Sequence, residues 1–293
     1  MKISAVINTY NEEKNIERCL KSVKDLAEEI IVVDMYSTDR TVEIAKKYKA
    51  KVFFHKYTRY VEPARNFALT KATGDWIFLI DADEEASQTL VEKLKKIAAA
   101  EEADFVEIPR KNIIFGRWIE HSRWWPDYLI RFFRKGQVSF LEEIHQPPQT
   151  EGKGLKLEAE EKNALIHYNF QTISQFIERL NRYTDIQSEE LFQKGDRFNW
   201  KNLIIKPTDE FLSRFFAGEG YKDGIHGLVL AGLQAFSEFV LYLKVWEKEG
   251  FEGQEINEIG SISLKAIHDY LYWLQKMSAG FLEKLRLKIK AKI

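Results

Sequence analysis

The sequence predicts an α/β protein in which a mostly parallel sheet, flanked by helices, is followed by an α-helical region. Over the first hundred residues, four short apolar segments alternate with stretches whose apolar residues recur at helical spacing. From about residue 172 onward the helical patterns continue, but the strand patterns stop. Strands that alternate with helices in this way are typical of βαβ units, in which the strands run parallel.

The four expected strands are rich in Val, Ile and Phe and are bounded by polar or turn residues, as buried strands are. Between them, apolar residues at i, i+4 and i+7 predict helices with one buried face. Asp39 favours a further helix start, because an Asp side chain can cap free backbone N–H groups. The strands are expected at residues 3–7, 29–33, 52–54 and 76–80, and the helix-spaced residues are Ile16, Leu20, Val23, Leu90, Leu94 and Ile97.

The rest of the chain divides into an irregular middle and a helical C-terminal part. Residues 105–167 hold many aromatic side chains and the loop signals Trp125-Pro126-Asp127 and Pro147-Pro148. Helical patterns then cover residues 174–192, 208–216, 227–249 and 261–277. We therefore expect an α/β domain over residues 1–168, with halves at 1–100 and 101–168, and an α-helical region over residues 169–293.

Composition limits the partners and the location of the protein. Forty-four Lys and Arg against 45 Asp and Glu give a net charge of −1, which argues against a nucleic-acid binder. Cys19 is the single cysteine, so no internal disulfide can form, and a reducing, cytoplasmic setting is expected. No run of 18 apolar residues predicts a membrane-spanning helix. The protein is expected to be soluble or to lie on a membrane surface without crossing it.

The strongest chemical signal is the pair Asp81 and Asp83, which follows the strand expected at residues 76–80. Ligands of open parallel sheets bind at the carboxyl ends of the strands. Two carboxylates there can hold a divalent cation, since Mg²⁺ needs one or two carboxylates and phosphate oxygens. Glu84 and Glu85 follow directly, but acids at this point also favour the start of the next helix. We therefore assign the cation to the two Asp residues.

Two further strand ends point to the same edge of the sheet. Asp34 ends the second expected strand, and residues 8–12 join the first strand to a helix whose N-terminus can face an anion. The sequence has neither the glycine-rich dinucleotide fingerprint nor a P-loop. These features together predict a phosphate-bearing ligand that is held through a metal rather than by a glycine-rich loop.

Four sequence blocks in this order resemble those of family-2 glycosyltransferases. A single block would be a weak signal, but the ordered set is specific. Less sharply, residues 131–134, 144–146 and 220–227 resemble a bacterial branch that contains glucosyltransferases of lipopolysaccharide core and surface polysaccharide assembly. The four blocks are residues 6–13 (VINTYNEE), 32–39 (VVDMYSTD), 64–69 (ARNFAL) and 72–84 (ATGDWIFLIDADE).

The resemblance implies a GT-A fold, whose Rossmann-like half binds a nucleotide-sugar, and inverting glycosyl transfer from a UDP-linked donor. It implies that Asp34 binds the base, and that Arg65 approaches the diphosphate or the ribose. Asp81 would meet the ribose or the metal, and Asp83 would coordinate Mg²⁺ or Mn²⁺. The residues expected to border the nucleotide are Thr9, Asn11 and Glu12.

Inverting transfer also needs a general base for the acceptor hydroxyl. The candidates in the irregular middle are Glu143, then Glu142, then Asp127, whereas Gln146 cannot accept a proton. Two neighbouring acids can equally form a solvated surface pair. His145 could be a metal ligand or a diphosphate contact, although a single histidine is more often structural.

The acceptor is expected to be a saccharide or a lipid-linked saccharide, because the resembling branch builds such polymers. Residues 284–293 alternate basic and apolar side chains, which predicts contact with anionic lipid, although a solvated tail has the same pattern. Two other functions stay open: a nucleotide-sugar-binding or membrane-adaptor protein without activity, and a nucleotidyltransferase. The absence of glycine from residues 7–15 counts against the nucleotidyltransferase, which needs a glycine-rich phosphate loop.

Overall fold

A computed structural model describes residues 1–58, 62–140, 147–278, 286 and 289. The chain forms two compact units. The first, an α/β unit, comprises Met1–Trp118 and Trp125–Asn169. The second, a helical unit, comprises Ile119–Trp124 and the described residues from Phe170 onward. A short segment between two strands of the α/β unit thus belongs to the helical unit.

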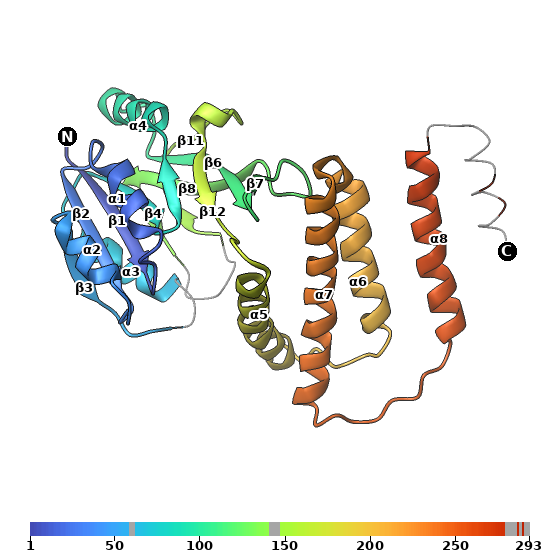
Figure 1. Cartoon of the computed structure of the whole chain (residues 1–293). Helices are drawn as coiled ribbons and strands as arrows, with labels where there is room; N and C mark the ends of the chain where they lie inside the picture. The colour runs from blue at the N-terminus through green and yellow to red at the C-terminus, as the bar shows by residue number, and fades with distance from the viewer. Residues whose placement is uncertain (59–61, 141–146, 279–285, 287–288, 290–293) are drawn as a thin grey trace. The chain divides into compact units, whose positions relative to one another are not determined.

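The sheet of the α/β unit begins with the parallel strands that the sequence predicted (Figure 1). β1 (Ile3–Thr9) lies between β2 (Glu29–Asp34) and β4 (Trp76–Asp81), and β3 (Lys51–Phe54) pairs with β2. The helices of this half are α1 (Ile16–Val23), α2 (Thr41–Lys47), α3 (Glu62–Lys71) and α4 (Gln88–Ala100). The structure therefore confirms the α/β fold class, with a mostly parallel sheet flanked by helices.

Strand β1 has side chains in two apolar clusters of the α/β unit. Ala5 and Ile7 pack with residues of α1 and α4, whereas Val6 packs with residues of α3. This division follows from the alternation of side chains along a strand. The helix-spaced residues of the sequence pattern all lie buried in the first cluster: Ile16, Leu20, Val23, Leu90, Leu94 and Ile97.

The middle of the chain continues the same sheet, which the sequence pattern did not reveal. β8 (Asp127–Arg134) pairs antiparallel with β4 and with β6 (Phe105–Ile114), and β12 (Leu165–Tyr168) joins β6 to β5 (Glu84–Ala86). The expectation of irregular structure over residues 105–167 is therefore wrong for β6 and β8. A register shift in β6 and the buried charge of Arg131 in β8 interrupt the apolar alternation of a simple strand. The shorter strands here are β7 (Arg117–Trp118), β9 (Val138–Ser139), β10 (Gln149–Thr150) and β11 (Gly154–Lys156).

The helical unit contains α5 (Ile173–Gln193), α6 (Asn202–Leu212), α7 (Ile225–Lys248) and α8 (Ile259–Met277). Helices therefore follow the α/β unit, as the sequence predicted. α6 begins six residues earlier than expected, because Pro207, which usually marks a helix boundary, lies inside the helix. A short π-helical segment, Ser213–Ala217, continues α6.

Asp223, from the sequence block at residues 220–227, holds the short segment that belongs to this unit. The buried carboxylate accepts hydrogen bonds from the backbone N–H groups of His121, at 2.9 Å, and Glu120, at 3.3 Å. In addition, the Ser122 N–H donates to the carbonyl of Gly218 at 2.7 Å. The block thus has a structural function, which is to fasten residues 119–124 to the helical unit.

Candidate active site

Three predicted site residues end adjacent strands at the carboxyl edge of the parallel strands. In the sheet register, Asn8 of β1 pairs with Asp81 of β4, and Thr9 pairs with Asp34 of β2. Side chains of paired residues in neighbouring strands project from the same face of the sheet. Thr9 and Asp34 therefore project from one face of the sheet and Asn8 and Asp81 from the other, at the edge where open α/β sheets bind ligands.

Asp34 lies buried inside a turn that joins two loops at this edge. Its carboxylate oxygens accept hydrogen bonds from the Ser37 N–H at 2.8 Å and from the Ser37 hydroxyl at 2.5 Å. Ser37 also accepts from the Asn11 N–H at 2.8 Å, and the Asn11 side chain accepts from the Thr38 N–H at 2.8 Å. The loops after β1 and β2 therefore form one connected structure. The role of Asp34 toward a nucleotide base stays a prediction.

Two polar side chains at the end of β1 are buried without a hydrogen-bond partner in the described part of the chain. These are Thr9, which is 2% exposed, and Asn8, which is 5% exposed and has neither side-chain polar atom paired. Buried polar atoms are almost always satisfied by protein, water or ligand. Glu12, by contrast, accepts from the Asn15 side chain at 2.8 Å.

The Asp81 carboxylate forms ion pairs with two guanidinium groups. Arg65 of α3 donates to both of its carboxylate oxygens at 3.1 Å, and Arg131 of β8 donates to Oδ2. Burial alone would raise the pKa of the Asp81 carboxyl, but the charges of Arg131 and Arg65 outweigh burial and hold this pKa well below its usual range. A cation would have to displace two positive charges to bind this carboxylate, so Asp81 does not suit the role of metal ligand.

Glu84 belongs to the same ionic network, contrary to its interpretation as a helix-start residue. It lies in β5, fully buried, and accepts from Arg131 at 3.2 Å, from Arg110 of β6 at 3.4 Å and from the Asp81 N–H at 2.9 Å. The cap of α4 is instead Ser87, whose side chain accepts from the Leu90 N–H. Glu84 is buried because β5 pairs with β12 inside the sheet.

Replacing Asp81 by Asn should destabilise the protein at neutral pH by about 3 kcal/mol, because it leaves buried guanidinium charge underpaired. The native pKa of Asp81 lies below its unfolded value, so the carboxylate stabilises the fold above about pH 4 and loses this effect as the pH falls. The difference between wild type and Asp81→Asn should therefore shrink below about pH 4. Urea unfolding over a pH series measures this, and a difference that is independent of pH would contradict the ionic pairing.

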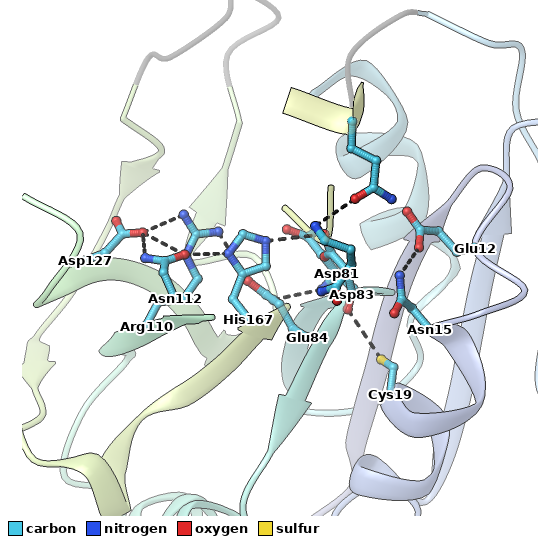
Figure 2. A network of polar contacts seen from close by, with 12 residues as sticks. Glu12, Asn15, Cys19, Asp81, Asp83, Glu84, Arg110, Asn112, Asp127 and His167 are labelled. Atoms are coloured by element: carbon cyan, nitrogen blue, oxygen red, sulfur yellow. Dashed lines mark hydrogen bonds and ion pairs between the residues drawn. The ribbon is translucent and has the colours of Figure 1, made fainter. Parts of the chain in front are cut away.

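Asp83 meets a histidine of β12, the strand that pairs with β5 directly after it (Figure 2). Its Oδ2 lies 3.3 Å from Nε2 of His167 in β12. Nδ1 of His167 lies 2.6 Å from Oδ1 of Asn112 in β6, and Nδ2 of Asn112 donates to Oδ2 of Asp127 at 3.1 Å. Asn112 presents its oxygen to His167, so Nδ1 must carry the hydrogen of that bond. Nε2 therefore faces the Asp83 carboxylate with either a proton or a lone pair.

The two donor atoms of this pair are of the kinds that bind divalent cations. Adjacent ligands of an octahedral ion at about 2.1 Å lie roughly 3.0 Å apart, close to the 3.3 Å between Nε2 and Oδ2. A carboxylate suits Mg²⁺ and Mn²⁺, and a neutral imidazole favours Mn²⁺ of the two. Among the described residues, no three His, Cys, Asp or Glu side chains gather as a metal site. The remaining positions are left to water, to phosphate oxygens or to a residue outside the described ranges.

Asp127 is the one candidate base that lies within the described ranges. Arg110 Nε and Nη2 donate to its Oδ2 at 2.8 and 2.6 Å, as does Asn112, whereas no described residue donates to Oδ1. The side chain is 27% exposed. One carboxylate oxygen is thus fixed by three hydrogen bonds, and the other is available to accept a proton. Glu142, Glu143 and His145 lie outside the described residues.

Four residues of this network were not predicted as site residues from the sequence: Arg110, Asn112, Arg131 and His167. Arg131 and His167 did carry a signal, because each is a charged or titratable residue within a short apolar stretch. A buried strand tolerates such a residue only where a partner meets it. The identity of the partners was not available from the sequence, since these residues are far from them along the chain.

The fold and the site define a class of protein: an α/β protein whose sheet edge gathers carboxylates and a histidine suited to a cation, without a glycine-rich phosphate loop. The chain belongs to glycosyl transferase family 2, whose model matches residues 4–150. The protein is therefore a glycosyltransferase that uses a nucleotide-sugar donor, and the resemblance found in the sequence is confirmed.

The chain is similar to several bacterial proteins. It is 32% identical over 259 residues to an uncharacterized glycosyltransferase of Rickettsia typhi, with 84% of this chain and 87% of the relative covered. It is 25% identical over 259 residues to the lipopolysaccharide core biosynthesis glycosyltransferase LpsC of Rhizobium meliloti, with 86% and 94% covered. Among solved structures, S. aureus TarS 1–349 in complex with UDP matches at 19% identity and a TM-score of 0.46, over 99% of this chain and 88% of that chain.

Proposed function

We propose that this protein transfers a hexosyl group with inversion from a UDP-linked donor to a saccharide or lipid-linked acceptor in lipopolysaccharide or surface polysaccharide assembly. The pathway is supported by the similarity to LpsC along most of both chains. The mechanism is carried by one observation, the contact of Asp83 with His167 at the carboxyl edge of the sheet. We assign to this pair the Mg²⁺ or Mn²⁺ that the donor diphosphate requires.

The charge balance of the site supports this assignment. Three carboxylates of the network, Asp81, Glu84 and Asp127, are each paired with guanidinium groups. The guanidinium groups are also three: Arg65, Arg110 and Arg131. Asp83 differs from these acids, because it lies against an imidazole that can be neutral. The charges of Asp81, Glu84 and Asp127 are thus matched by those of the three guanidinium groups. A divalent cation beside Asp83 would be the counter-ion of the remaining carboxylate.

The residues around the pair would bind and orient the donor. Asn112 holds His167 in the tautomer whose Nε2 lone pair can face a cation. The resemblance assigns Thr9, Asn11, Glu12 and Asp34 to the nucleotide and Arg65 to the diphosphate or ribose. When bound, the cation neutralises the charge of the leaving nucleoside diphosphate. Asp81 would act through Arg65 and Arg131, which it holds in place.

The acceptor hydroxyl must lose its proton as it attacks the anomeric carbon from the face opposite the diphosphate. We keep the order Glu143, Glu142, Asp127 for the base. Asp127 remains a candidate because Arg110 and Asn112 fix Oδ2 and leave Oδ1 for the proton. His145 stays an alternative ligand for the cation or a contact of the diphosphate.

The donor half of this proposal is tested by thermal unfolding of the wild-type chain with UDP. A ligand that binds the native state raises the melting temperature, by an amount that grows with ligand concentration over Kd. UDP with Mn²⁺ or Mg²⁺ should raise it by several degrees more than UDP with a chelator or the metal alone. Equal shifts with and without the metal would overturn the assignment of a cation to the site.

A further inference from the structure

Helix α8 of the helical unit is drawn in orange-red in Figure 1. It is rich in apolar residues that are at most partly buried. None of its 19 residues is buried. Tyr270 and Trp273 contact the ring of Phe216, with centroids 5.6 and 6.0 Å apart. In water, a helix of this kind normally depends on tertiary packing of an apolar face for its stability.

A second apolar stripe of α8 has two exposed residues. Leu264 is 50% exposed and Ile267 is 52% exposed, and Leu271, which is partly buried, continues the stripe one turn further. These positions are separated by three and four residues, so they lie on one side of the helix. Trp273, nine residues after Leu264, lies on the far side of the helix, and Tyr270, three residues after Ile267, lies between the two sides. We refer to Leu264, Ile267 and Leu271 as the outer stripe of α8.

The charges near α8 are distributed unequally. Residues 249–258, which precede the helix, hold four Glu and no Lys or Arg. Residues 259–293 hold seven Lys and Arg against two acids. Of the part that follows α8, the structure describes Ser278, which is buried, and Arg286 and Ile289, which are exposed. The outer stripe therefore belongs to a segment with a marked positive charge.

We propose that the outer stripe of α8 docks on the surface of an anionic phospholipid bilayer. An apolar stripe with basic residues close in sequence is what an interfacial helix needs to bind anionic lipid. A second copy of this chain is the other possible occupant, and the test below distinguishes it from lipid. This inference goes beyond the proposed function and does not rest on the donor site.

Helix α7 is a less suitable candidate for contact with the membrane. By length and composition it could span a bilayer, with a mean hydropathy of 1.5 over an 18-residue window of which 28% is buried. However, Leu230, Ala231 and Val245 of α7 are buried, and the helix packs on α5 and α6 within the helical unit. Its exposed residues also lack a basic segment of the kind that follows α8.

The test is co-sedimentation of the full chain with vesicles of phosphatidylcholine, alone or with about one third phosphatidylglycerol. The wild-type chain should bind the anionic vesicles, more weakly at about 500 mM salt than at about 50 mM, and should bind the neutral vesicles at least tenfold more weakly. Leu264→Ser/Ile267→Ser should lower anionic binding about tenfold, because it removes two inserting side chains. Phe54→Ser, at a residue 47% exposed in the α/β unit, is the matched control and should bind as the wild type does.

Equal binding of the double variant and the wild type, or equal binding to both vesicle types, would overturn the proposal. Light scattering of the same samples tests the alternative occupant, a second copy of this chain. A wild-type dimer that becomes a monomer in the double variant would assign the stripe to the second copy and overturn the proposal. Because the substituted side chains are exposed, the melting temperature should not change. In Leu264→Ser/Ile267→Ser, UDP with Mn²⁺ should still raise the melting temperature as in the wild type. This measurement tests the donor site independently of membrane binding.

Discussion

Asp83→Ala should lower sugar transfer by a factor on the order of 10³, and the UDP-dependent rise in melting temperature should no longer depend on Mn²⁺ or Mg²⁺. The reason is that Asp83 is the carboxylate of the network that lies against an imidazole, whereas Asp81, Glu84 and Asp127 are held by guanidinium groups. His167→Ala should have the same effect in smaller measure, on the order of 10², because the carboxylate still supplies one ligand.

The matched control is Glu85→Gln, two residues from Asp83. Glu85 accepts a hydrogen bond from the Tyr168 hydroxyl at 2.9 Å and lies 3.8 Å from Arg18, so it has structural partners but no imidazole beside it. Transfer and metal dependence should stay close to wild type in this variant. Turnover should be measured over a range of Mn²⁺ concentrations with UDP-sugars as donors. Full metal dependence in Asp83→Ala would show that the cation is held elsewhere.

Glu143→Gln should lower turnover by a factor on the order of 10² to 10⁴ while the affinity for UDP and Mn²⁺ stays near that of wild type. Gln keeps the size of the side chain but cannot take the acceptor proton. The measurement is turnover at saturating donor, together with UDP binding from the thermal shift. A large loss of UDP binding in this variant would instead indicate that Glu143 belongs to the donor site.

The comparison variants for the base are Glu142→Gln and Asp127→Asn. Asp127→Asn keeps the shape of the side chain but removes the negative charge that pairs with Arg110, so unfolding must be measured alongside turnover. If Glu143→Gln retains turnover and one of the others loses it without loss of stability, the role passes to that residue. Retention in all three would place the base outside these candidates.

Local patterns in the sequence were sufficient for the parallel half of the fold. The spacing of apolar residues can be read directly from a sequence. It predicted the strands β1, β2 and β4 and the buried faces of α1 and α4. The location of the site followed as well, because the carboxyl ends of parallel strands meet at one edge. The ordered blocks over residues 6–84 were enough to identify the glycosyltransferase family.

The antiparallel half of the sheet and the contacts of the site were decided by tertiary structure. Arg131 and Asp81 are 50 residues apart, and His167 and Asn112 are 55 apart, yet each pair meets because β4, β8, β6 and β12 are neighbours in the sheet. Strand order depends on the packing of the whole chain, and no local pattern encodes it. By itself the sequence therefore determined which residues could carry chemistry, whereas the fold decided that Asp81 is paired with arginines and that Asp83 faces a histidine.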